Sequence, residues 1–158
     1  MKKILILLIA ISFILGCEKE ATVNKCNILP TLEKVNELID KCNENQFNSK
    51  SEIEDNLIGE WALSGVISDW IDFEPISECL LLTINNDSFI LKNLETNEEF
   101  SSTWEMVSYE VNDLKVFYLE ANDQELRWKV GMQNFSKNIM YGSGNADDTD
   151  TYVYKKLR

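Results

Sequence analysis

The stretch Leu57-Ile58-Gly59-Glu60-Trp61-Ala62-Leu63-Ser64-Gly65-Val66 is where the spacing of apolar residues changes along the chain. Before it, apolar residues recur every three or four positions. Within it, Trp61, Leu63 and Gly65 alternate with their neighbours, and a period of two is typical of a strand with one buried face. We therefore expect the chain to switch from helix to sheet here.

Seven further segments after this stretch also have strand-like patterns. They are residues 78–84, 89–91, 100–109, 114–119, 126–132, 138–141 and 149–156. Apart from residues 68–77, the connections are of hairpin length, which leaves no room for the long crossovers that parallel strands need. An antiparallel meander of eight strands can close on itself and so remove its exposed edges. The prediction is an all-β, eight-stranded antiparallel up-and-down barrel.

A single helix is expected ahead of the barrel, over residues 28–44. Ile28, Leu32, Val35, Ile39 and Cys42 recur at spacings of four and three, which places them on one face of a helix. We expect this face to pack on the sheet. The polar residues 44–55 are interpreted as a linker or loose turn.

The amino terminus has the pattern of an export signal. Met1-Lys2-Lys3 is basic, and residues 4–15 are apolar except for Ser12. Twelve residues of helix rise about 18 Å, which is short of the roughly 30 Å hydrocarbon core of a bilayer. Residues 1–16 are therefore predicted to be a signal peptide and not a membrane-spanning helix.

Ile14-Leu15-Gly16-Cys17 follows directly and resembles the lipobox of bacterial lipoproteins. The resemblance implies cleavage after Gly16, acylation of Cys17 and attachment to a membrane through its fatty chains. Residues 17–27 would then be a tether. The absence of Asp at position 18 favours the outer membrane of a Gram-negative cell envelope. The alternative is an ordinary signal peptide followed by an incidental cysteine.

Residues 56–158 resemble a bacterial lipocalin-like domain. The Gly-x-Trp pattern of Gly59 and Trp61 is that of the first lipocalin strand. Residues 80–89, 102–105 with 114–116, and 151–158 are similar in order and spacing to later strands of these domains.

The resemblance implies that Gly59 and Trp61 form the narrow end of the barrel. Gly59 would let the strand bend close to its neighbours, and Trp61 would fill that end with its ring. A basic side chain of the last strand, Lys156 or Arg158, would stack on the Trp61 ring. The alternative for Trp61 is core packing alone.

Composition and charge argue against several functions. The chain has 27 acidic and 15 basic residues, a net charge of −12, and no histidine. The acidic balance argues against nucleic-acid binding, which needs clustered Lys and Arg. Without histidine, Ser-His-Asp and Cys-His catalysis are excluded. We expect no enzyme activity, no cofactor and no metal, and we interpret residues 147–150 as a solvated hairpin tip.

The lipocalin resemblance implies a cup for a small apolar or amphipathic ligand. The candidate lining residues are Trp104, Tyr118, Leu126, Trp128, Val130 and Tyr152. A competing hypothesis is a lipid-anchored interaction or inhibitor module that binds an unknown protein partner and fills its barrel with its own side chains.

Three cysteines remain after acylation, so one internal disulfide at most is possible. Cys42 lies on the apolar face of the predicted helix, and Cys79 begins a strand. We predict that any bridge joins Cys42 to Cys79 and leaves Cys26 free. The alternative is three reduced thiols, with Cys42 and Cys79 as small buried side chains.

Overall fold

The computed structural model describes residues 26, 28–29, 31–68, 78–123, 126–143 and 150–158. The predicted signal peptide 1–16, Cys17 and most of the tether 17–27 lie outside the described residues. The hairpin tip at residues 147–150 also lies outside them, except for Asp150.

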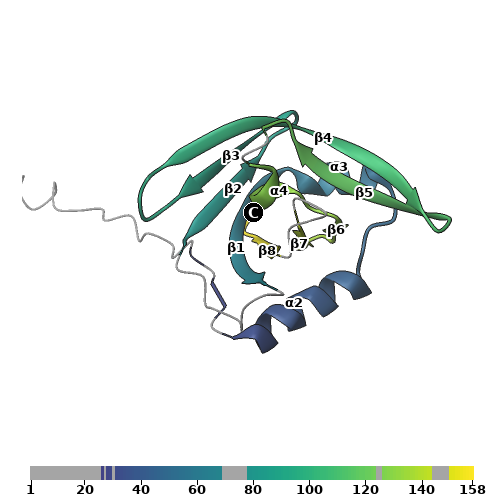
Figure 1. Ribbon diagram of the computed structural model, residues 1–158, viewed down its shortest axis with the longest axis horizontal. Helices are drawn as coiled ribbons and strands as arrows, with labels where there is room; N and C mark the ends of the chain where they lie inside the picture. The colour runs from purple at the N-terminus through teal and green to yellow at the C-terminus, as the bar shows by residue number, and fades with distance from the viewer. Residues whose placement is uncertain (1–25, 27, 30, 69–77, 124–125, 144–149) are drawn as a thin grey trace, which may run out of the picture.

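The described residues form eight antiparallel strands in one continuous sheet, which confirms the predicted fold class (Figure 1). The order across the sheet is β5-β4-β3-β2-β1-β8-β7-β6, so strands that are consecutive in sequence pair with each other, except β5 and β6, and β1 also pairs with β8. The strands are β1 (Gly59–Ile67), β2 (Leu80–Ile84), β3 (Ser88–Asn93), β4 (Glu99–Val111), β5 (Leu114–Ala121), β6 (Asn134–Phe135), β7 (Ile139–Gly142) and β8 (Thr151–Lys156).

The sheet curls into a nearly closed barrel, and the long strand β4 turns one of its corners. Residues 99–103 of β4 pair with β3, whereas residues 104–111 pair with β5. The remaining seam lies between β5 and the chain ahead of β6. Within the described residues, one isolated bridge crosses it, where the Leu119 N–H donates to the Met132 carbonyl at 2.9 Å.

The predicted strand over residues 126–132 is wrong. Residues 127–130 form the short helix α4 (Arg127–Val130), and the sixth strand is the two-residue β6. The N–H groups of Lys129 and Val130 both donate to the Leu126 carbonyl at 3.2 Å. Leu126 and Val130 fit an alternating pattern, but they are also four residues apart, the spacing at which two side chains share one face of a helix.

In the described part of the chain, two helices precede the barrel, where one was expected. Helix α2 (Leu32–Glu44) begins after the N-cap Thr31, inside the expected range 28–44. Helix α3 (Lys50–Leu57) begins within the segment 44–55 that was interpreted as a linker and occupies its second half.

A serine N-cap explains where α3 begins. The Ser49 hydroxyl accepts from the Glu52 N–H at 3.3 Å and donates to the Glu52 carboxylate at 2.9 Å. A serine followed three residues later by glutamate has the spacing of a capping box, which is a sequence signature of a helix N-terminus. Ile53 and Leu57 are buried at a spacing of four, so the helix also contributes to the core.

Helix α2 packs on the outside of the barrel, as expected for its apolar face. Val35 and Cys42 are fully buried against Ile139 of β7 and Val153 of β8. The approach is close, because a Cβ on Gly65 of β1 would lie 2.5 Å from a Val35 methyl carbon. Gly65 therefore allows the helix to lie directly on the strand.

Candidate functional site

Trp61 lies near the end of the barrel at which β1 begins and β8 finishes. The Trp61 side chain is 1% exposed, and its indole N–H donates to the Leu57 carbonyl at the end of α3 at 2.8 Å. The ring therefore has a hydrogen-bond partner for its polar atom, as a buried tryptophan requires. Helix α3 and β1 together hold this ring in place.

Of the two basic residues proposed to stack on Trp61, the structure places Lys156 there. The Lys156 amine lies 5.1 Å from the centroid of the Trp61 ring, within the range of a cation–π contact. The same amine donates to the Asn56 carbonyl. Partial burial lowers the pKa of Lys156 below its usual value. Arg158 instead pairs with the Glu60 carboxylate at 2.7 Å.

Gly59 lets the start of β1 lie directly against the chain that follows β8. Its φ of 139° lies in the region that favours glycine, and a Cβ there would lie 2.3 Å from the Arg158 carbonyl oxygen. The Glu60 N–H donates to that oxygen at 3.0 Å, and the Leu157 N–H donates to the Glu60 carbonyl at 2.8 Å. We call Asn56, Gly59, Trp61, Lys156 and Arg158 the closed end.

The barrel interior is one continuous apolar cluster. Every strand and both α3 and α4 contribute buried side chains to it. Among the candidate lining residues, Leu126 and Val130 are buried in this cluster, and Trp104 and Tyr152 are partly buried and pack against it. The side chain of Trp128 lies outside what the structure describes.

The prediction that Tyr118 lines the interior is wrong, because Tyr118 lies on the outward face of β5. Phe117 and Leu119 belong to the interior cluster, and neighbouring residues of a strand point to opposite faces. The Tyr118 hydroxyl donates to the Ser143 carbonyl at 3.3 Å. In residues 114–119, both alternating sets of residues contain large apolar side chains, so alternation alone could not show which set faces the interior.

Helix α4 is attached to the rest of the barrel by polar contacts. The Tyr154 hydroxyl donates to the Lys129 carbonyl at 2.9 Å, and the Lys129 amine pairs with the Glu78 carboxylate at 3.0 Å. Tyr154 is fully buried, and burial raises the pKa of its hydroxyl far above the usual value. This hydroxyl is therefore neutral at physiological pH, and the interior cluster has no charged member among the described residues.

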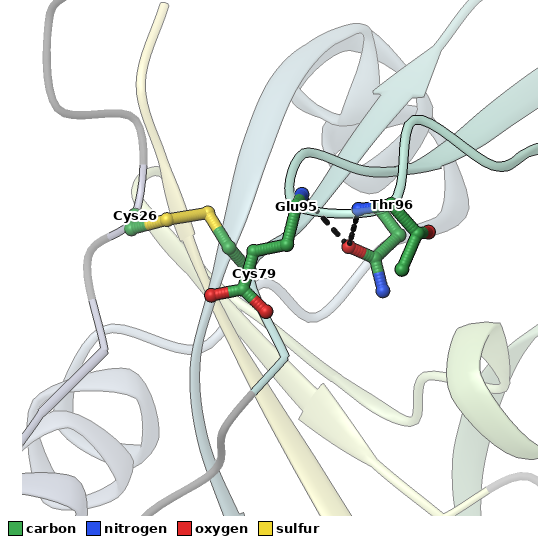
Figure 2. The surroundings of a disulfide bond; sticks show 5 residues. Cys26, Cys79, Glu95 and Thr96 are labelled. Carbon is green, nitrogen blue, oxygen red and sulfur yellow. Dashed lines mark hydrogen bonds between the residues drawn. A yellow bond between two sulfur atoms is a disulfide. The ribbon is translucent and has the colours of Figure 1, made fainter.

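The predicted disulfide between Cys42 and Cys79 is also wrong. Cys79 is bonded to Cys26, with 5.2 Å between their Cα atoms, and Cys42 is a free buried thiol (Figure 2). The Leu29 N–H donates to the Ser64 carbonyl at 2.8 Å, which holds the segment after Cys26 against β1. Cys42 lies in the last turn of α2, and its thiol points to the Ile139 carbonyl of β7 at 3.5 Å.

The disulfide lies at the end of β2 that is away from the closed end. Gly59 pairs with Ile84, the last residue of β2, whereas Cys79 directly precedes the first. The Leu94 N–H of the turn between β3 and β4 donates to the Cys79 carbonyl at 2.8 Å. In that turn the Asn93 side chain accepts from the N–H groups of Glu95 and Thr96 (Figure 2).

Two surface clefts of about 220 Å³ each are lined by described residues. One lies beside the closed end and contains Lys137, Lys156 and Arg158. The other lies along the open seam between β5 and β6. In the described ranges, no group of three or more Cys, Asp or Glu side chains could hold a metal ion. Among the same residues, no helix has the length and apolar character needed to cross a membrane.

No protein-family model, curated protein or solved structure matches this chain. The sequential antiparallel order of eight strands and the nearly closed shape are consistent with a lipocalin-like fold.

Proposed function

We propose that this protein is a lipid-anchored binding protein of the bacterial cell envelope whose lipocalin-like barrel takes a small apolar or amphipathic ligand. The observation that carries the proposal is the asymmetry of the barrel. Trp61 fills one end, and partly buried apolar side chains lie toward the other.

Val66 and Tyr152 mark that second end. They are register partners on β1 and β8, both are partly buried, and both pack against the interior cluster. The pair lies several residues along β1 from Trp61. A ligand that enters beside it would meet apolar side chains, because the cluster contains no charge among the described residues. Burial of apolar surface would therefore drive binding, at about 25 cal/mol per Å².

Native mass spectrometry of the protein purified from its own host tests this function. The proposal expects a small molecule to be retained, and Tyr152→Ala to reduce its occupancy. Thr151→Ala is the matched control, because its side chain points to the opposite face of β8. A ligand-free mass for the unmodified protein would contradict the proposal.

Anchoring is tested separately through Cys17. The Cys17→Ser variant should move from the membrane fraction to the periplasmic fraction, because acyl chains on Cys17 are the proposed attachment. Cys42→Ser is the control, since that thiol lies on the buried face of α2 and its replacement should leave the fractionation unchanged. Unchanged membrane retention of the Cys17→Ser variant would refute the anchor.

A second candidate function is a protein-interaction or inhibitor module with a filled barrel. Full burial of Met132, Met140 and Tyr154 favours it, because these large side chains occupy the interior themselves. In addition, the Tyr154 hydroxyl is bonded to α4 and is not available to a ligand. A ligand-free mass together with a co-purifying protein would favour this function over the first.

A further inference from the structure

Strand β5 has a paired edge and an open edge. All eight of its residues are in register with β4 on one side. On the other side, among the described residues, the bridge from Leu119 to Met132 is the one ladder contact. Among the described residues, the part of β5 from Leu114 to Phe117 therefore has no neighbouring strand on the side of the seam.

The direction of the Leu119 bond shows which main-chain groups point into the seam. The Leu119 N–H points to Met132, and main-chain groups of every second residue in a strand point the same way. The N–H and C=O groups of Lys115 and Phe117 therefore face the seam. Within the described parts of the chain, these groups have no main-chain hydrogen-bond partner.

The second cleft lies directly along this open edge, and we call it the edge cleft. Its apolar lining includes Phe47, Ile53, Phe117 and Phe135. The segment between α2 and α3 forms one wall, because the Phe47 N–H donates to the Phe135 carbonyl of β6 at 2.8 Å. Figure 1 shows this segment passing beside β6. The edge cleft thus combines free strand groups with an apolar floor.

The polar lining of the edge cleft consists of carboxamides and one cation. The carboxamides are Gln46, Asn48, Gln133 and Asn134, and Lys115 is the charged member. The Gln46 amide donates to the Asn134 amide oxygen at 2.9 Å, and the Asn48 and Gln133 amides donate to the carbonyls of Gln46 and Ser143. Because a carboxamide carries two N–H groups and an oxygen that can accept two bonds, each still has capacity for an occupant. Among the described residues, the lining contains no carboxylate, although the chain carries 27 acidic residues. The N–H groups and oxygen of a carboxamide can pair with the C=O and N–H groups that alternate along a peptide main chain. The lone Lys115 amine favours an uncharged or acidic occupant over a basic one.

We propose that the edge cleft binds an extended segment of another polypeptide, which adds as a strand to β5. The segment would exchange main-chain hydrogen bonds with Lys115 and Phe117 and place one apolar side chain between Phe117 and Phe135. Strand addition at an open sheet edge is an established mode of peptide recognition. The edge cleft, at about 220 Å³, is smaller than the roughly 300–1,000 Å³ of ordinary small-molecule pockets, so a small molecule is the less favoured occupant. This proposal does not depend on a ligand in the barrel interior.

The first test is amide hydrogen exchange of the full mature protein followed by NMR. The Lys115 and Phe117 amides should exchange quickly in the free protein, whereas the Val116 and Tyr118 amides, which face β4, should be protected. The probe is an array of capped eight-residue peptides in which Thr and Val alternate around a central position that carries each of the twenty amino acids in turn. Peptides with an apolar centre should protect the two fast amides.

Two variants at one position separate the main chain from the side chain. Lys115→Pro removes the free N–H, and proline is tolerated on the unpaired edge of a strand. It should weaken peptide binding at least about tenfold, which corresponds to the loss of a main-chain contact. Lys115→Ala keeps the N–H and should change binding by about threefold or less, since the exposed charge contributes little. Circular dichroism of both variants verifies that the barrel is folded.

Three results would overturn the proposal. The first is slow exchange of the Lys115 and Phe117 amides in the free protein, which would mean that the edge is already paired. The second is no protection by any peptide of the array at about millimolar concentration, the weak limit of specific binding. The third is a dimer in sedimentation experiments that Lys115→Pro dissociates, because the occupant would then be a second copy of this chain.

Discussion

Truncation of Trp61 tests the closed end directly. In the Trp61→Ala variant, the barrel loses a side chain that is 1% exposed and belongs to the interior cluster. It also loses the bond from the indole N–H to the Leu57 carbonyl and the contact with the Lys156 amine.

The expected loss of unfolding free energy is about 5 kcal/mol. Replacing a buried large aromatic residue with alanine costs about 3–5 kcal/mol, which includes the cavity left behind. The Leu57 carbonyl loses its partner, which adds about 1 kcal/mol, and the cation–π contact contributes about 0.5 kcal/mol more. Because these contributions overlap, we take about 5 kcal/mol, the upper end of the range for replacing a buried aromatic residue, as the expected loss of unfolding free energy. It is at least a third of the roughly 5–15 kcal/mol that stabilises an ordinary domain.

Urea unfolding at neutral pH, followed by far-ultraviolet circular dichroism with the disulfide intact, measures this loss. Trp61→Phe is the matched variant, because it keeps most of the ring volume and removes the N–H. It should lose about 1–2 kcal/mol, the cost of the missing hydrogen bond and a small cavity. A loss of unfolding free energy below about 2 kcal/mol for Trp61→Ala would refute the reasoning, because truncation of a side chain that fills the closed end should cost more than that.

Three further predictions concern the disulfide, the titration of Lys156 and the backbone at Gly59. Replacing both Cys26 and Cys79 with serine should lower the free energy of unfolding by about 2–4 kcal/mol in urea, because the disulfide closes a loop with a sequence separation of 53. Peptide mapping that found Cys79 bonded to another cysteine would contradict this pairing. The pKa of Lys156 is lowered in the folded state from 10.5, so the unfolded chain binds more protons between the two values and stability rises with pH across that window. As the pH rises toward 10.5, the native protein should therefore gain stability relative to Lys156→Met, and a constant difference in urea midpoint would refute the shift. Gly59→Ala should cost about 2–3 kcal/mol in thermal unfolding, because a Cβ at φ 139° would lie 2.3 Å from the Arg158 carbonyl oxygen, and an unchanged melting temperature would contradict this account.

Much of the fold is encoded in local patterns. Period-two alternation around Trp61 and in the later segments predicted eight antiparallel strands in sequential order, and seven of those segments contain strands of the sheet in that order. The eighth strand, β6, follows the segment 126–132 instead of lying within it. Short connections forced antiparallel pairing, because a parallel crossover needs more chain than they contain. The helical spacing of Val35 and Cys42 likewise predicted the face that α2 buries.

One missed feature had a local signal. Ser49 and Glu52 have the spacing of a capping box, a pattern that is visible in sequence, and Ile53 and Leu57 follow at helical spacing. The high polarity of residues 44–55 led to their interpretation as a linker.

The other errors could not be avoided by local reasoning. Leu126 and Val130 fit both a strand and a helix, and residues 117 and 118 are both large and aromatic. Which alternative forms depends on what lies opposite, namely the Tyr154 hydroxyl below α4 and the interior beneath β5. Similarly, any two of Cys26, Cys42 and Cys79 satisfy the arithmetic of one disulfide, but pairing requires Cα atoms within about 7 Å. Alternation, capping and loop length act between residues that are near in the chain, so they determine most of the strands and their order. The face that each side chain presents to the interior, the pairing of the cysteines and the open edge of β5 depend on contacts between distant segments. These features therefore exist only once the barrel has formed.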